Sequence, residues 1–366
     1  MNPDTDRAFG ELTPEFMLDA LEAAGLRGDG RMLQLNSYEN RVLQVHLEDG
    51  RVAVAKFYRP GRWTEAQILE EHAFAAELAD AEVPVARPWT LERSEHFAHP
   101  QGALELLGSP ATLGRIGTQR FAVASRQGGR APELEDAEVL RWIGRLLARL
   151  HQVGVRRPFE HRVRWWGAEP GETARRWLME HQVLPPEIAP RWDRVVQDCL
   201  ALIARAFEDL GDVPQLRLHG DCHPGNILWT PDRGPHFVDL DDAVTGPAVQ
   251  DLWMLLSGDD ATARWQWDAL MDGYESIREF DWRERRLIEP LRTLRMIHHS
   301  AWLARRWGDP AFPLAFPWFG TPNYWNDQVA KLAEQLEAMQ SAGEPPSSPS
   351  LEDDDDDFHL DGDSFS

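Results

Sequence analysis

The run from residue 219 to residue 242 constrains this chain more than any other segment. It starts His-Gly-Asp, places Asn226 five residues after Asp221, and continues through two apolar stretches and a Pro- and Gly-containing turn to Asp239. Short apolar stretches on either side of such a turn predict a pair of strands. The expected strands are residues 227–229 and 236–238. This hairpin would place Asn226 and Asp239 side by side, within reach of one cation that prefers oxygen ligands.

The same order of side chains is the layout of a kinase phosphoryl-transfer loop, in which one Asp serves the attacking hydroxyl and an Asn and a second Asp bind metal. We expect Asp221 to be the catalytic base, or the group that orients the acceptor hydroxyl, because a carboxylate can take up the hydroxyl proton. Asp239, the second expected catalytic residue, and Asn226 are the expected ligands of Mg²⁺ held by the phosphates of ATP. Whether Asp241 also touches the metal stays open. The alternative is a polar loop beside an Asp-rich turn. The joint occurrence of the His-Gly-Asp start, Asn226 and the hairpin argues against it.

Two segments nearer the N-terminus supply candidate contacts to ATP. Lys56 stands in an apolar frame, residues 52–57. A lysine on a buried strand needs an anionic partner, and phosphates together with a helix glutamate meet that need. The candidate glutamates are Glu70 and Glu71. Ser37 lies in a glycine-free hairpin where its hydroxyl and backbone N–H could bind a phosphate, with an ordinary Asn/Ser turn as the alternative.

In these motifs the chain resembles the aminoglycoside phosphotransferase and choline kinase-like branch of the protein kinase superfamily, in which His-Gly-Asp replaces His-Arg-Asp. The segments 35–42, 56–64 and 250–256 are similar to those of bacterial stress-response Ser/Thr protein kinases. The resemblance implies a cytoplasmic enzyme that transfers the γ-phosphoryl group of ATP to Ser and Thr hydroxyls of proteins, with Mg²⁺. It also favours Ser37 as a nucleotide contact and Glu71 as the partner of Lys56.

The pattern of elements indicates an α+β, bilobal, protein-kinase-like fold. Residues 1–125 are expected to form an N-terminal nucleotide-binding lobe, a five-stranded antiparallel sheet with one crossing helix. Residues 126–342 are expected to form a mainly α-helical catalytic lobe. Residues 343–366 are rich in Pro, Ser and Asp and are expected to be a disordered acidic tail. The expected strands are 32–36, 41–46, 51–58, 103–107 and 119–125, and the expected helices are 11–27, 64–79, 133–153, 191–210, 262–279, 282–307 and 323–340.

The charge of the chain narrows the class of partner. The formal net charge is -23, which argues against generic nucleic-acid binding because such binding needs basic patches. No apolar run approaches the length that spans a bilayer, and the N-terminus lacks the pattern of a signal peptide. The two cysteines give neither a disulfide framework nor a zinc pattern. We expect a cytoplasmic monomer with no nucleic-acid or membrane partner.

Three functions remain in competition at this point. A Ser/Thr protein kinase and a small-molecule kinase, acting on an amino alcohol, sugar or antibiotic, would use the same phosphate and metal residues, so the loop cannot separate them. An acidic pocket would suit a cationic small substrate. The third function is that of a catalytically dead nucleotide-binding regulator, and intact Lys56, Asp221, Asn226 and Asp239 argue against it.

Overall fold

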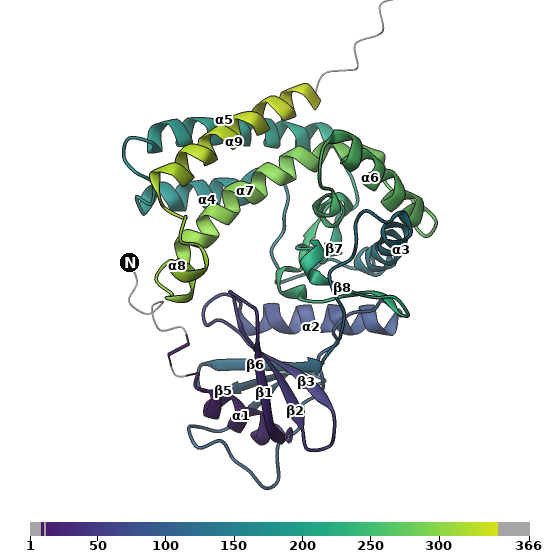
Figure 1. The fold of residues 1–366 in the computed structure, drawn as a ribbon, viewed down its shortest axis with the longest axis vertical. Coiled ribbons are helices and arrows are strands. Elements are labelled where there is room, and N and C mark those ends of the chain that lie inside the picture. Colours follow the sequence, from purple (N-terminus) through teal and green to yellow (C-terminus); the bar gives the residue numbers. More distant parts are fainter. Residues whose placement is uncertain (1–8, 11, 343–366) are drawn as a thin grey trace, which may run out of the picture.

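The computed structural model describes residues 9, 10 and 12–342, and the predicted acidic tail lies outside the described residues. A β-sheet with helices α1 and α2 forms one part, called here the N-terminal lobe, and helices α3 to α9 form the C-terminal lobe. Figure 1 shows the sheet below, the helices above and α2 lying between them. The division after residue 125 stays a prediction, and strand β6 ends at Ser125.

The sheet has six antiparallel strands in the order β1-β2-β3-β6-β5-β4, so the expected number of five was wrong. The strands are β1 (Gly28–Leu35), β2 (Arg41–Leu47), β3 (Val52–Phe57), β4 (Glu105–Leu107), β5 (Leu113–Ile116) and β6 (Gln119–Ser125). The missed strand is β5. Its second residue, Gly114, is of a type depleted in strands. In the fold that glycine is needed, because a Cβ at Gly114 would lie 2.5 Å from the Phe121 ring.

Both helices of the N-terminal lobe begin just after a threonine that caps them. The Thr13 hydroxyl accepts a hydrogen bond from Phe16 N (3.2 Å) at the start of α1 (Pro14–Ala23). Thr64 and Gln67 form a reciprocal capping box at the start of α2 (Glu65–Asp80). Phe74 of α2 belongs to the hydrophobic core of the C-terminal lobe, where it packs edge-on against Phe159 (5.4 Å between ring centroids). Helix α2 therefore joins the two lobes.

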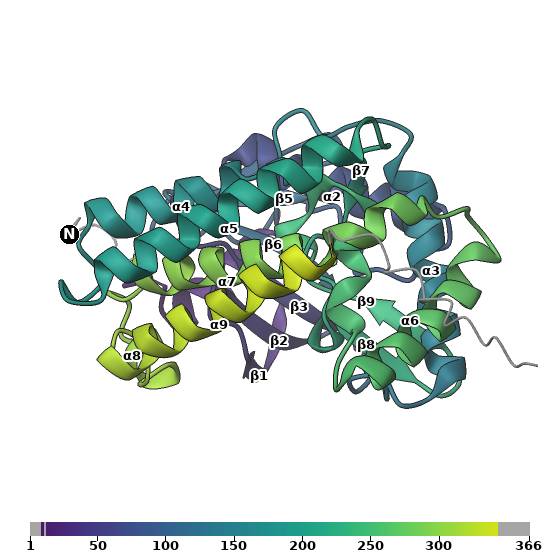
Figure 2. The same cartoon turned by 90° about the horizontal axis from the view of Figure 1, so that it is seen from above.

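The C-terminal lobe contains the α-helices α3 (Ala137–Gly154), α4 (Glu169–Glu180), α5 (Ala189–Leu210), α6 (Asp260–Glu275), α7 (Ile288–Arg305), α8 (Ala311–Ala315) and α9 (Pro322–Ala342). Figure 2 shows α4, α5, α7 and α9 running side by side. The expected helix 282–307 is divided into a 3₁₀ segment (Trp282–Leu287) and α7. Pro290 lacks an N–H and is tolerated only in the first turn, so the α-helix begins just before it.

Two helices, α4 and α8, were not predicted. Helix α4 opens with Glu169-Pro170-Gly171, a sequence typical of a loop. Tertiary packing decides its structure, since a Cβ on Gly171 would lie 2.5 Å from Leu200 of α5 and 2.8 Å from Leu294 of α7. Among the helices of the described residues, none is long and apolar enough to cross a membrane.

Candidate active site

The predicted hairpin is present and consists of β8 (Ile227–Thr230) and β9 (Gly234–Phe237). Ile227 pairs with Phe237, and Val238 N donates to the backbone carbonyl of Asn226 (3.0 Å). The second strand starts at Gly234, earlier than expected. Gly234 has a φ of 72° and approaches the Trp142 ring so closely that a Cβ would lie 2.5 Å from it. The hairpin therefore brings Asn226 beside Val238, the residue just before Asp239, as the spacing predicts.

Asp251 stabilises the loop before the hairpin through hydrogen bonds to its backbone. This residue was not predicted from the sequence as part of the site. Its carboxylate accepts hydrogen bonds from the backbone N–H groups of His219 and Gly220, both at 2.8 Å. It also lies 3.2 Å from Nε2 of buried His151. His219 is fully buried, and its Nε2 lies 2.9 Å from the Val238 carbonyl. These contacts fix the backbone just before Asp221 and just after the hairpin.

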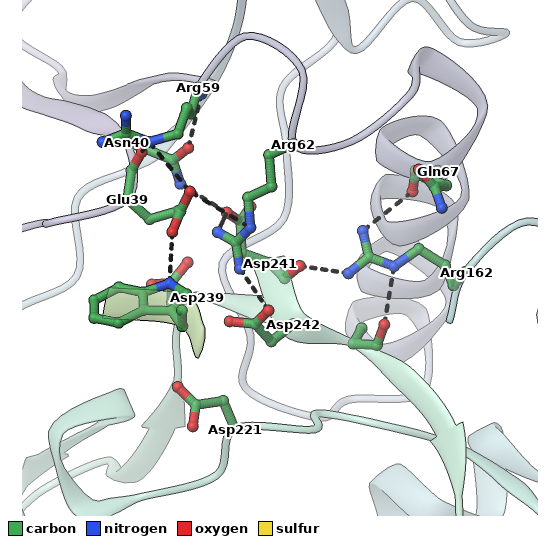
Figure 3. Close-up of polar contacts among 12 residues, drawn as sticks. Glu39, Asn40, Arg59, Arg62, Gln67, Arg162, Asp221, Asp239, Asp241 and Asp242 are labelled. Atoms are coloured by element: carbon green, nitrogen blue, oxygen red, sulfur yellow. Dashed lines mark hydrogen bonds and ion pairs between the residues drawn. The ribbon is translucent and has the colours of Figure 1, made fainter. Parts of the chain in front are cut away.

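Asp221 lies below Asp239 and Asp242 in Figure 3. Its Oδ1 forms an ion pair with Nη1 of Arg295 at 2.6 Å, and Nδ2 of Asn226 donates to its backbone carbonyl at 2.9 Å. Arg295 comes from α7, and no sequence motif flagged it. The structure therefore places a half-exposed guanidinium directly against the candidate base.

Lys56 points from β3 to the turn that follows β9. Its Nζ lies 2.7 Å from Asp239 Oδ1 and 3.2 Å from Asp241 Oδ1. Burial disfavours its charge, but the carboxylates of Asp239 and Asp241 outweigh burial and hold the pKa of Lys56 well above its usual value. The predicted pairing of Lys56 with Glu71 needs correction, because the observed ion pairs go to the two aspartates.

Glu71 nevertheless lines the same pocket as Lys56. Burial raises the pKa of Glu71 to about 7, and the charge of Lys56 only partly opposes this. Glu70 faces another way, since its carboxylate accepts hydrogen bonds from the backbone N–H groups of His161 and Arg162, both at 2.9 Å. Of the two candidate glutamates, Glu71 is thus the one beside the site.

Asp241 is buried inside a polar network that ties the two lobes together (Figure 3). Its Oδ2 accepts hydrogen bonds from Nδ2 of Asn40 (2.6 Å) and Nη1 of Arg62 (3.0 Å). Burial opposes its ionisation, but the charges of Lys56 and Arg62 outweigh burial and hold the pKa of Asp241 well below its usual value. Arg62 also pairs with Asp242 at 2.5 Å. The observed contacts of Asp241 therefore attach the turn after Asp239 to the N-terminal lobe.

A cavity of about 410 Å³ lies between the lobes and contains most of the predicted site residues. Its walls include apolar side chains of the sheet and, from the hairpin, Leu228 and Phe237, while Lys56, Asn226 and Asp239 gather at one end. Ser37 also lines it, and its Oγ accepts a hydrogen bond from Asn40 N at 3.2 Å, which leaves the hydroxyl proton free to donate. An apolar pocket with polar groups at one end suits a nucleotide with its phosphates at that end.

The donor set at this end fits Mg²⁺ only in the company of phosphates. Asp239 offers a half-exposed carboxylate, and the amide of Asn226 donates through Nδ2, so its oxygen is left as an acceptor. Within residues 9, 10 and 12–342, no group of three or more His, Cys, Asp or Glu side chains could hold a metal ion. Mg²⁺ in kinase sites is held by one or two protein oxygens together with substrate phosphates and waters, and that arrangement matches these residues.

Comparison with known proteins adds evidence on the family of this chain. The model of the Phosphotransferase enzyme family matches residues 32–288. The chain is 43% identical to Stress response kinase A of Salmonella choleraesuis (strain SC-B67) over 343 residues, covering 94% of this chain and 97% of that one. It is 42% identical over 343 residues to Serine/threonine protein kinase RdoA of Salmonella typhimurium (strain LT2), with the same coverage.

Among solved structures, amicoumacin kinase hAmiN in complex with AMP-PNP, Ca²⁺ and Ami has a similar fold. The TM-score is 0.63 at 17% identity, and the match covers 92% of this chain and 96% of that chain. At this identity the likeness concerns the fold alone, which is the predicted bilobal, kinase-like α+β architecture. From its family model, its relatives and its fold together, the chain belongs to the phosphotransferase enzyme family as a kinase homologous to stress response kinase A.

Proposed function

We propose that this chain is an ATP-dependent Ser/Thr protein kinase that acts in the bacterial stress response. The observation that carries the proposal is the likeness to relatives named Stress response kinase A and Serine/threonine protein kinase RdoA, at 42–43% identity over nearly the whole chain. Action as a monomer in the cytoplasm is part of the same proposal.

The donor half of the site binds and orients ATP. Lys56, on the N-terminal lobe, can bind the phosphates, and Ser37 can donate its hydroxyl proton to them. Asp239 and Asn226 would hold Mg²⁺. When bound, Mg²⁺ supplies positive charge that neutralises the phosphate oxygens. Lys56 then exchanges part of its contact with Asp239 for phosphate oxygens, since both anions compete for the same ammonium group.

The acceptor half is organised around Asp221. The hydroxyl oxygen of a Ser or Thr attacks the γ-phosphorus, the bond from that phosphorus to the bridging oxygen breaks, and ADP leaves with the electron pair. Asp221 takes up the hydroxyl proton as the new bond forms. Arg295, 2.6 Å from Asp221, fixes the orientation of the carboxylate.

A small-molecule kinase is the second candidate, and the shared fold of amicoumacin kinase favours it. The charge of helix α7 weighs against a cationic acceptor of that kind. Helix α7 contains three arginines (Arg292, Arg295 and Arg305) and one acidic residue, Glu289, which pairs with Arg292, while Arg295 touches Asp221. An amino alcohol or aminoglycoside would meet like charge beside the base, and juxtaposed like charges are unfavourable. A neutral hydroxyl on a protein segment meets no such repulsion.

The proposal is tested with radiolabelled ATP, Mg²⁺ and two sets of acceptors, a panel of proteins and a panel of amino alcohols, sugars and antibiotics. We expect phosphate on Ser or Thr of proteins, with the signal absent from the Asp221→Asn variant. Turnover of a small alcohol with no phosphate on any protein would contradict the proposal and leave the phosphotransferase assignment in place.

A further inference from the structure

The nucleotide loop, defined here as residues 36–40 between β1 and β2, is attached to the C-terminal lobe. This loop contains no glycine, so it cannot wrap phosphates with a freely adaptable backbone. Tyr38 leaves the N-terminal lobe and packs against Phe316 and Phe312, with ring centroids 4.9 and 6.4 Å apart. Both phenylalanines lie at helix α8, whereas Ser37, next to Tyr38, lines the ATP pocket.

Glu39 makes the central contact of this attachment. Its side chain is buried, and its carboxylate accepts hydrogen bonds from the indole Nε1 of Trp302 (2.8 Å) and from Nη2 of Arg306 (2.9 Å). Nε of Arg59 lies 3.2 Å from the same carboxylate. Trp302 belongs to α7, and Arg306 follows its last residue. Figure 3 shows Glu39 directed away from the sheet, towards an indole ring.

Neighbouring contacts complete the attachment. Asn40 donates to Asp241 at 2.6 Å and accepts from Arg59 N at 3.1 Å. Arg59 reaches Asp309 of the C-terminal lobe at 2.8 Å. Three consecutive loop residues are thus tied to three parts of that lobe, namely α8, α7 and the turn after Asp239. A loop held at so many points has one conformation instead of the range that a glycine-rich flap samples.

We propose that Glu39 is a positioning residue, which anchors the nucleotide loop to α7 and thereby holds Ser37 at the phosphates of ATP. The inference rests on the proposed function only in taking ATP as the phosphoryl donor. The proposal also gives a role to residues 38–41 and 59–62, which belong to the segments that resemble stress-response kinases. Neither stretch has a role in the proposed phosphate chemistry. Here they form the two sides of the anchor.

The physical ground is preorganisation. A buried carboxylate must be compensated by donors, and Trp302, Arg306 and Arg59 provide them from both lobes. Ordering a loop when the ligand binds subtracts from affinity, so a loop that is already fixed binds more tightly. Without the Glu39 charge, Arg306 would lose its carboxylate partner, Arg59 would keep only Asp309, and the loop would move away from α7.

The test is a double-mutant cycle read out by calorimetric affinity for Mg²⁺-ATP, with KM for ATP and kcat measured alongside. We expect Ser37→Ala and Glu39→Gln each to weaken ATP binding by about tenfold, the loss of roughly one good hydrogen bond to a charged group. Because Glu39 acts through Ser37, the double variant should be no weaker than the weaker single variant. The matched control is Asp49→Asn in the neighbouring β2–β3 hairpin, an exposed partner of Arg51 (2.6 Å), which should leave the affinity unchanged.

Two results would overturn the proposal. One is multiplication of the two losses in the double variant, since independent effects mean that Glu39 does not act through Ser37. The other is wild-type ATP affinity in Glu39→Gln. If Glu39→Gln does not fold, Trp302→Phe removes one donor from α7 and keeps the ring, and it should weaken ATP binding by about threefold; an unchanged affinity there would equally reject the anchor. Absence of any protein acceptor would defeat the proposed function without altering these affinities.

Discussion

The two carboxylates Asp239 and Asp221 flank the same hairpin, but their cationic partners come from opposite lobes. Asp239 pairs with Lys56, which lies on β3 of the N-terminal lobe. Asp221 pairs with Arg295, which lies on α7 of the C-terminal lobe. The proposed donor side of the site is therefore assembled across the lobe interface, whereas the proposed acceptor side is built within one lobe. Changes on the two sides should have different kinetic consequences.

The largest effect is expected for Asp239→Asn, which removes a negative charge from the donor side and keeps a residue that tolerates the same backbone. Phosphoryl transfer should fall to background, and the affinity for Mg²⁺-ATP should fall with it, because a neutral amide oxygen replaces the charged carboxylate oxygen proposed to bind the metal. Transfer assays and calorimetry with and without Mg²⁺ measure the two effects. Near-wild-type turnover at ordinary Mg²⁺ concentration would remove Asp239 from the donor side.

Asp221→Asn should separate the two sides most clearly. Transfer is expected to fall by roughly a hundredfold or more, the range for loss of a general base, while ATP binding stays close to that of the wild type. Single-turnover kinetics and ATP affinity provide the measurement. A variant that loses ATP affinity and keeps its transfer rate per bound ATP would reverse the roles assigned to the two aspartates.

Arg295→Gln tests whether the cation on α7 belongs to the acceptor side. We expect kcat to fall by about tenfold, because the orientation of Asp221 loosens, with KM for ATP unchanged. Arg292→Gln is the matched control on the same helix, since Arg292 pairs with Glu289 at 2.8 Å and not with Asp221. An increase of KM for ATP in Arg295→Gln alone would show that α7 also serves the donor side.

The smallest effect concerns stability and the donor side. Burial raises the pKa of Glu71 to about 7. A carboxyl with a raised folded-state pKa stabilises the fold below its unfolded pKa, and this contribution is lost as the pH rises through about 7. The melting temperature should therefore decline between pH 5 and pH 8 more steeply in the wild type than in Glu71→Gln. Parallel pH curves for the two proteins would show that Glu71 is not buried in neutral form.

The sequence predicted those parts of the site that are local. Asn226 and Asp239 meet because a short hairpin joins them, and both strands and turn have distinctive compositions. Arg295, Asp251 and Glu39 were missed for the opposite reason: each acts on a partner far away in the chain, and pairing at that range depends on helix packing that one sequence does not reveal.

The same distinction holds for the fold and for Lys56. Capped helices such as α1 and α2 were predicted, while α4 and β5 depend on glycines that pack closely against distant residues. The strand position of Lys56 was correct. Its ion-pair partner was not, because the burial of Asp241 beside it could not be foreseen.

The backbone conformation of Asp239 affects which variants of this protein a screen for thermal stability would enrich. Asp239 has φ 62° and ψ 61°, the left-handed conformation, which costs a residue with a side chain about 1–3 kcal/mol. Glycine adopts it without that strain. A library screened for heat resistance alone should therefore be enriched in Asp239→Gly, and the survivors would be inactive. At this position thermal stability favours glycine, whereas catalysis requires aspartate. A stabilised enzyme that is still active must therefore be selected for turnover.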